Sequence, residues 1–188
     1  MSEILLPHTV ISATRRWVET VVVELNLCPF ARRELQRDSV RFSVTAAVTT
    51  ERLLMDLQTE LVLLSKDEEI ETSLLIHPKF LQDFDDYNQF LHDSDELLLD
   101  MDLDGIFQIA SFHPDYQFAG TEQDAVENFS NKSPYPMLHL IRESSVERAI
   151  ASNPGSDQIP QRNIELLQGL GLVKMRALLQ YCLVNEEC

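Results

Sequence analysis

Two histidines in this sequence stand directly before prolines, and each follows a short apolar run. His77 follows residues 74–76, and His113 follows residues 106–112. Such runs predict buried strands, and ligands of open α/β sheets bind at the carboxyl ends of strands. If the two strands are parallel neighbours, both imidazoles lie close together at one rim of the sheet, where a histidine can act as a base or a metal ligand. Asp115 could orient the ring of His113.

Cys28 is the best candidate for a nucleophile. Pro29 after it suits the first position of a helix, which predicts that Cys28 is the N-cap. Unpaired N–H groups and the positive end of the helix dipole would favour a thiolate there, and Arg32 and Arg33 add positive charge. Two alternatives stay open: Cys28 follows the carboxyl end of an earlier predicted helix, which would disfavour a thiolate, or it is a buried, inert thiol. The first hypothesis is an enzyme with Cys28 as nucleophile and His113 as base.

The segment 114–136 between two predicted strands is rich in aromatic residues and prolines. Long loops in compact domains are usually functional or disordered, and this composition argues against disorder. We therefore expect an ordered loop over a pocket for a small, anionic molecule. The predicted substrate-binding side chains are cations, hydroxyls, an amide and one imidazole: Arg32, Arg33, His77, Tyr116, Asn131, Lys132, Ser133, Tyr135, Arg142 and Arg162.

A metal site is the second hypothesis. His139 falls inside the fourth predicted strand, whose start returns to the rim if that strand runs antiparallel to the third. His77, His113 and His139 could then supply metal ligands, although their spacing matches no zinc signature. The sequence has no phosphate-binding glycine loop and no nucleophile elbow, so it identifies no cofactor.

Charge is unevenly distributed along the chain, whose formal net charge is −16. Residues 56–104 hold fifteen acids and two lysines. This charge disfavours nucleic-acid binding, and it supports a third hypothesis, a non-catalytic adaptor that binds a basic partner through the 56–104 face.

No signal peptide and no apolar run of about 18 residues is present. With three scattered cysteines, we expect a cytoplasmic protein that does not bind membranes; the oligomeric state is not specified.

Periodicity predicts alternating helices and strands. A helix is expected from an N-cap at Thr9 to Leu25, and a capping box at residues 144–147 opens another. Further helices are expected at 30–36, 50–66, 80–101, 160–168 and 172–183, and strands at 40–46, 73–76, 106–112 and 137–141. This order predicts one α/β (or α+β) domain over residues 1–188, with a small four-stranded mixed sheet, helices packed on it, and a frayed tail at 184–188.

Four motifs together resemble a bacterial family known as domain of unknown function 1415. They are L-N-L-C-P-F-A (25–31), F-H-P-D-Y-Q-F (112–118), N-K-S-P-Y-P-M-L-H-L-I-R-E (131–143) and I-P-Q-R-N-I (159–164). The resemblance covers nearly the whole chain and implies a stand-alone domain. It implies no reaction. It also leads us to expect the four segments to converge in space.

Overall fold

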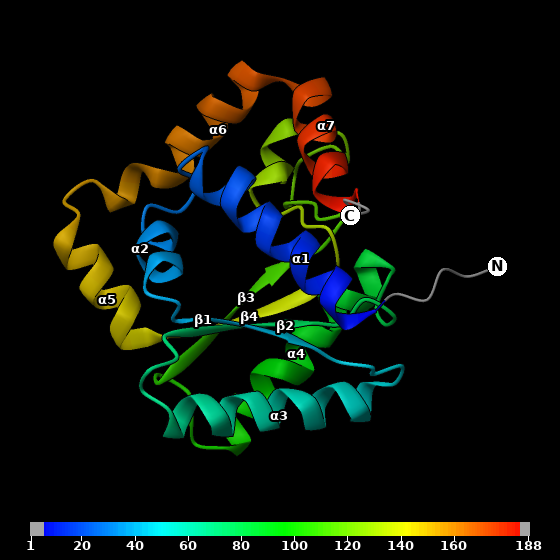
Figure 1. Cartoon of the computed structure of the whole chain (residues 1–188), viewed down its shortest axis with the longest axis vertical. Helices are drawn as coiled ribbons and strands as arrows, with labels where there is room; N and C mark the ends of the chain where they lie inside the picture. The colour runs from blue at the N-terminus through cyan, green and yellow to red at the C-terminus, as the bar shows by residue number, and fades with distance from the viewer. Residues whose placement is uncertain (1–5, 185–188) are drawn as a thin grey trace.

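The computed structural model of the chain describes residues 6–184 (Figure 1). The helices are α1 (Pro7–Trp17), α2 (Ala31–Gln36), α3 (Thr50–Lys66), α4 (Phe84–Asp100), α5 (Glu143–Ser152), α6 (Ile159–Leu170) and α7 (Leu172–Leu183). Three shorter segments are the π-helix η1 (Val18–Val23) and the 3-10 helices η2 (Val126–Ser130) and η3 (Ser156–Gln158). Of the tail predicted at 184–188, residues 185–188, which include Cys188, lie outside the described residues.

Four strands form one sheet: β1 (Val40–Val44), β2 (Thr72–Ile76), β3 (Phe107–Phe112) and β4 (Met137–Arg142). Their order is β1-β2-β4-β3. β1 and β2 are parallel, and β4 lies antiparallel between β2 and β3. The prediction of a single α/β domain with a four-stranded mixed sheet is therefore confirmed.

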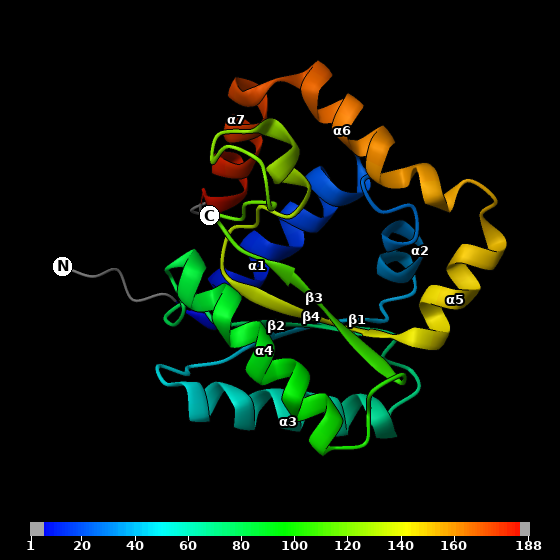
Figure 2. The same ribbon diagram turned by 180° about the vertical axis from the view of Figure 1, so that it is seen from behind.

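Helices lie on both faces of the sheet (Figures 1 and 2). Side chains alternate between the faces along each strand. Leu75, Leu138 and Leu140 pack with α3 and α4, whereas Leu74 and Met137 pack with α1, η1 and α7. We call these the α3/α4 face and the α1 face. None of the helices within residues 6–184 is long and apolar enough to span a bilayer.

Several helix ends differ from the predictions. The first helix starts at Pro7 with Leu6 as N-cap, so the predicted N-cap at Thr9 is wrong. Proline suits the first turn because a backbone N–H at that position would have no partner within the helix. The N-cap of α5 is Arg142, and no side chain caps that helix. The predicted capping box is therefore wrong. α4 starts at Phe84 because the Asp83 carboxylate accepts hydrogen bonds from two backbone N–H groups, and it continues unbroken past residue 93.

Candidate functional site

His77 and His113 lie one residue beyond β2 and β3, at the rim where the parallel strands end. β4 separates the two strands, so they are not neighbours. Both rings point to the α3/α4 face, where the ring of Tyr87 lies 5.8 Å from His77 and 5.0 Å from His113 between centroids. The structure thus brings the two histidines together around a tyrosine of α4.

Both ring nitrogens of His113 have partners inside the protein. Nδ1 accepts a hydrogen bond from the backbone N–H of Asp115 at 3.0 Å, and Nε2 donates to the Leu81 carbonyl at 3.1 Å. The residue is fully buried, and burial lowers its pKa, so the neutral ring is favoured. Asp115 holds this ring through its backbone N–H, and its own side chain is exposed.

His77 is also fully buried and neutral. Its Nδ1 donates to the Phe80 carbonyl at 2.9 Å. Its Nε2 is a buried acceptor without a partner among the described residues. Burial lowers the pKa of His77 to about 4, so at neutral pH this ring carries a lone pair and no charge.

Tyr87 is a residue at this rim that the sequence analysis missed. Its hydroxyl donates to the Met137 carbonyl at 2.8 Å and accepts from the Phe112 N–H at 3.1 Å. Phe112 and Met137 are paired residues of β3 and β4, so the hydroxyl links the ends of two strands to α4. In the sequence, Tyr87 stands at helical spacing between Phe84 and Phe90, a pattern typical of core positions.

The loop 114–136 is held in place by buried Asn128. Its side-chain oxygen accepts from the Phe118 N–H at 3.1 Å and from the Thr121 hydroxyl at 2.9 Å. Its amide nitrogen donates to the Glu122 carbonyl at 2.9 Å. One buried side chain therefore makes hydrogen bonds to three separate points of the loop. The same bonds give the buried polar atoms of Asn128 their partners, as buried polar groups require.

The end of this loop pairs with the strand exit at His113. The His113 N–H donates to the Asn131 carbonyl at 3.2 Å, and the Ser133 N–H donates to the His113 carbonyl at 3.3 Å. The Asn131 amide donates to Ser111, and the Ser133 hydroxyl donates to the Tyr135 carbonyl. Asn131 and Ser133, both predicted to bind substrate, are thus engaged in holding the loop to β3.

Lys132 lies between these two residues and is buried, with 8% of its surface exposed. Its ammonium donates to the Gln123 carbonyl at 3.3 Å and lies 5.2 Å from the ring centroid of Phe129. Among the described residues no carboxylate lies within ion-pair distance of it. Burial lowers the pKa of Lys132, and the more distant Asp115 and Asp124 oppose that shift.

Half-buried aromatic rings surround His113 next to Lys132. The ring of Phe84 lies 5.4 Å from His113 and 5.3 Å from Tyr116, and Tyr116 lies 4.9 Å from Phe118. These rings come from α4 and from the start of the loop. We call these three rings the aromatic wall. Tyr135, which was predicted to bind substrate, packs instead at the edge of the apolar cluster on the α1 face.

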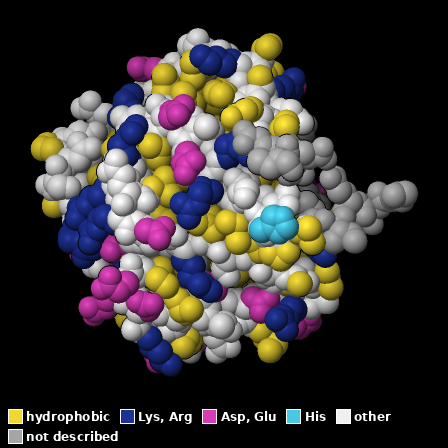
Figure 3. Space-filling model, in the orientation of Figure 1, with side chains coloured by type: hydrophobic (Ala, Val, Ile, Leu, Met, Phe, Trp, Pro, Cys, Tyr) yellow, Lys and Arg dark blue, Asp and Glu magenta, His cyan; other side chains and the backbone are white. Residues whose placement is uncertain are grey.

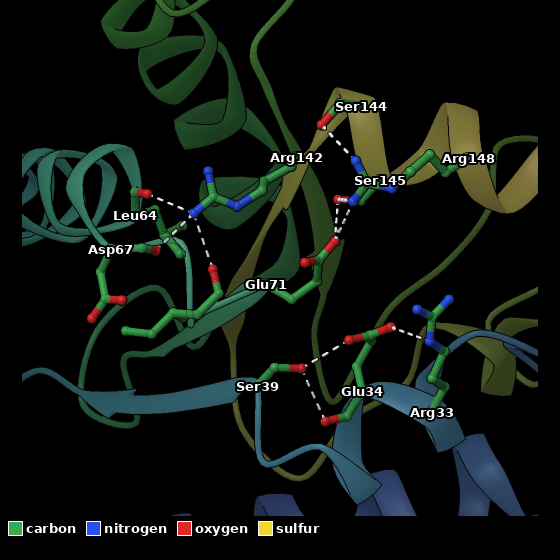
Figure 4. A network of polar contacts seen from close by, with 11 residues as sticks. Arg33, Glu34, Ser39, Leu64, Asp67, Glu71, Arg142, Ser144, Ser145 and Arg148 are labelled. Atoms are coloured by element: carbon green, nitrogen blue, oxygen red, sulfur yellow. Dashed lines mark hydrogen bonds and ion pairs between the residues drawn. The ribbon is translucent and has the colours of Figure 1, made fainter.

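Arg142 is far from the rim, at the other end of β4. Its Nη2 donates to the carbonyls of Leu64, Asp67 and Ile70, at 2.6, 2.9 and 3.0 Å (Figure 4). The first of these is one of the carbonyls at the end of α3 that lack a partner within the helix. Arg142 therefore caps the carboxyl end of α3.

The other predicted arginines also contact backbone or surface groups away from the rim. Arg162 donates to the Asn26 carbonyl at 2.5 Å, and Arg32 donates to Val23 at 3.3 Å. Arg33 is exposed beside Glu34 at 3.6 Å. Basic side chains gather over α2 and α5, at the left of Figure 3. No hydrogen bond, ion pair or ring contact among the described residues joins these arginines to His77 or His113.

Cys28 is not a helix N-cap. α2 begins at Ala31 and its N-cap is Phe30; the Cys28 carbonyl accepts the Ala31 N–H at 3.3 Å in the turn before the helix. The thiol is therefore separated from the free N–H groups of the first helical turn. Leu27 beside it belongs to the cluster on the α1 face, whereas His113 packs on α4, so the two candidates of the first hypothesis are attached to opposite faces of the sheet.

His139 lies in the middle of β4 and points to the α1 face, away from His77 and His113. It shares that side of β4 with Met137, and its Nε2 lies 2.8 Å from the Thr72 hydroxyl. The three histidines therefore do not converge. Within residues 6–184 no group of three or more His, Cys, Asp or Glu side chains is arranged to hold a metal ion.

Comparison with protein families agrees with the motifs. The model of the family described as "Protein of unknown function (DUF1415)" matches residues 9–177. The chain belongs to the DUF1415 family. No curated protein and no solved structure matches it.

The four motifs that carry the resemblance to the DUF1415 family form two pairs in space. Asn163 donates to the Leu27 carbonyl at 2.9 Å and so joins the motifs 159–164 and 25–31. The backbone bridge between His113 and Lys132 joins the other two. α6 packs on η2, which connects the pairs through the loop. The second pair of motifs supplies His113, Tyr116 and Lys132 to the rim, whereas His77 and the rings of Phe84 and Tyr87 come from outside the four motifs.

Proposed function

We propose that this DUF1415 protein binds a small anionic molecule at the loop 113–133, with the ammonium of Lys132 as the receiving group. A single observation carries the proposal: Lys132 is buried without a carboxylate partner. Lysines are almost never buried unless paired, because taking a charge out of water costs several kcal/mol. An anionic ligand would supply the missing counter-charge.

The surroundings of Lys132 suit such a ligand. Arg176 of α7 lies near enough to lower the pKa of Lys132, and its guanidinium pairs with Asp124 at 2.6 Å. A ligand anion would therefore meet Arg176 as a second cation, and the anion would compete with the exposed carboxylate of Asp124 for this guanidinium. The ring of Phe129 and the aromatic wall at His113 provide apolar contact, as small-molecule sites require.

The proposal is for binding and assigns no reaction. A His113 base would have to give up the N–H of Asp115 or the bond to Leu81. A Cys28 nucleophile would have to cross from the other face of the sheet. The geometry therefore supports recognition of the anion better than transfer of a proton between these two residues.

A second candidate is the adaptor with an acidic face. α4 contains no lysine or arginine, and its outer surface exposes Asp85, Asp86, Asp93, Asp95, Glu96 and Asp100. Like charges along one helix favour a basic partner through long-range attraction. Salt-sensitive binding of a lysine-rich peptide, lost when Asp93, Asp95 and Glu96 are changed to asparagine or glutamine, would support it. Binding that persists in that variant would contradict it.

Thermal unfolding with added anions tests the primary proposal, because a ligand that binds only the folded state, at free concentration L, stabilises it by RT ln(1 + L/Kd) and so raises Tm as its concentration rises. The probes are inorganic phosphate and malonate. We expect the Tm of the natural protein to rise with the concentration of at least one of them, and the Tm of Lys132→Met not to respond. Lys174→Met removes an exposed lysine of α7, and this control should respond like the natural protein.

The same variants give a second readout without any anion. Because Lys132 is an unpaired buried charge, Lys132→Met should keep or raise the stability of the free protein, as apolar replacement of buried charges often does. A response to anions that survives in Lys132→Met would overturn the proposal. So would a natural protein that responds to neither probe.

A further inference from the structure

The α1 face of the sheet is only partly covered. Thr72, Gln108, Ala110, His139 and Ile141 lie on it and are half-buried. Their neighbours along the same strands on the opposite face, such as Ser73, Leu138 and Leu140, are fully buried. We call these five half-buried residues the open strip.

The half-burial of these five residues shows that the helices on this face cover the open strip only in part. α1 runs over the part of the sheet where the parallel strands end, and α5 stands to one side of the sheet (Figures 1 and 2). α5 follows β4 directly, and none of its residues is buried. The strip therefore lies between a well-packed helix and one that packs on little.

His139 presents a free acceptor on the open strip. The Thr72 hydroxyl donates its only hydrogen to the Leu140 carbonyl, so at 2.8 Å it must accept from His139 Nε2–H. This leaves His139 Nδ1 with a lone pair, and none of the described residues donates to it. Burial lowers the pKa of this ring to about 4, so it is neutral and stays an acceptor at neutral pH.

Trp17 presents a free donor on the same face. Its indole N–H is buried and has no partner among the described residues. The ring lies 5.2 Å from Phe112, whose other neighbour is His139 at 5.9 Å between centroids. Trp17 is also the last residue before the π-helix η1, and π-helical turns are frequent at functional sites. A donor and an acceptor thus flank one phenylalanine ring.

We propose that the open strip is a binding site for an uncharged, planar molecule, aromatic or heterocyclic, that donates a hydrogen bond to His139 Nδ1. Ala110 and Ile141 offer it an apolar floor, and Phe112 offers a ring edge. The strip contains no charged side chain, so a charged ligand would lose its hydration without compensation. The site uses none of the residues assigned to the anion and does not depend on that assignment.

NMR titration with phenol tests the site. The chain has one tryptophan, so its indole N–H gives one resonance that reports on Trp17 alone. We expect phenol to shift that resonance saturably. His139→Phe should weaken phenol binding at least tenfold, whereas toluene, which has no donor, should bind the natural protein and this variant alike.

Two further variants make the test decisive. Ala110→Phe fills the strip next to His139 and should abolish the shift with phenol; it decides the question if His139→Phe does not fold. His92→Phe changes an exposed histidine of α4 and should leave phenol binding unchanged. An indole resonance that phenol does not move, or phenol affinity that is unchanged in Ala110→Phe, would overturn the proposal.

Discussion

The two faces of the sheet differ in how completely they are closed. On the α3/α4 face the large apolar side chains of α3, β2 and β4 are fully buried. On the α1 face the open strip keeps solvent contact and the buried indole N–H of Trp17 lacks a partner among the described residues, whereas the unpartnered Nε2 of His77 lies on the α3/α4 face. Both faces carry a buried apolar cluster, so the comparison teaches that the α1 face combines a core of its own with a strip of strand residues that stay half-buried.

Even a buried charge is fully paired on the α3/α4 face. Glu60 of α3 accepts two hydrogen bonds from Arg41, at 2.9 and 3.1 Å, and one each from the hydroxyls of Ser43 and Ser73. Burial opposes its charged form, but these hydrogen bonds outweigh burial and lower the pKa of Glu60. Lys132 at the rim is the opposite case, a buried charge left with one backbone carbonyl.

Truncation of one core residue on each face should show the largest difference. Leu138→Ala removes a fully buried side chain of β4 from the α3/α4 face, and we expect a loss of about 2–5 kcal/mol in unfolding free energy. Ile141→Ala, on the open strip of the same strand, should cost no more than about half as much, because its side chain is already partly hydrated. Urea unfolding measures both, and equal losses would break the comparison.

Acid should destabilise the protein through the buried histidines. The pKa of His77 is about 4 in the folded protein and about 6.5 when unfolded. Between these values the unfolded chain binds a proton that the folded chain does not, so this contribution is intact above pH 6.5 and is lost as the pH falls to 4. The expected loss is about 3 kcal/mol for His77.

The slope of stability against pH checks this expectation. His77→Phe should flatten the profile between pH 4 and 6.5, whatever its effect at pH 7. His92→Phe, at an exposed position, should leave the slope unchanged. An unchanged slope in His77→Phe would show that the ring does not stay neutral on the closed face.

Loss of the Tyr87 hydroxyl should have an intermediate effect. In Tyr87→Phe the Phe112 N–H and the Met137 carbonyl lose a buried partner, which typically costs about 1–3 kcal/mol. Tyr181→Phe, at a tyrosine that is 51% exposed, should be neutral within about 0.5 kcal/mol. Similar Tm values for the two variants would mean that the hydroxyl does not couple α4 to the strand ends.

Enlarging an alanine should have the smallest effect on the open strip. Ala110→Leu adds volume where solvent is present, so we expect a change within about 0.5 kcal/mol. Ala47→Leu, at a fully buried alanine in the cluster with α3 and α4, should cost about 1–3 kcal/mol through overpacking. If Ala110→Leu lowers the free energy of unfolding as much as Ala47→Leu does, the strip is not open.

Periodicity predicts most of the elements of this chain. The bounds of α3 and α7 agree at both ends with the helices expected at 50–66 and 172–183, and all four strands are found within two residues of their expected ends. The rim with His77 and His113 also follows from local pattern, because apolar runs end there. Helix starts were less predictable, since Thr9 is a residue type that suits an N-cap and Pro29 after Cys28 suits the first position of a helix, yet neither Thr9 nor Cys28 is an N-cap.

The partners of long side chains were not predictable from the sequence. Arg142 was expected to bind an anion, but it contacts carbonyl groups more than seventy residues earlier. His139 was expected near the other histidines, but the strand pleat turns it to the opposite face. Lys132 lies in a loop whose path is set by Asn128, a residue with no visible signal in the sequence. Each of these outcomes depends on tertiary contacts that residue spacing does not encode.

The central position of β4 has a consequence for how the chain folds during synthesis. β2 and β3 are joined only through β4, which is the last strand to be made. At roughly 5–20 residues per second, residue 142 follows residue 112 by roughly 2–6 s. For that time β3 has no neighbouring strand, and its apolar side chains, such as Phe107, can pack only on elements already made, such as α4. A chain truncated before residue 137 should therefore fail to join β3 to the pair of β1 and β2.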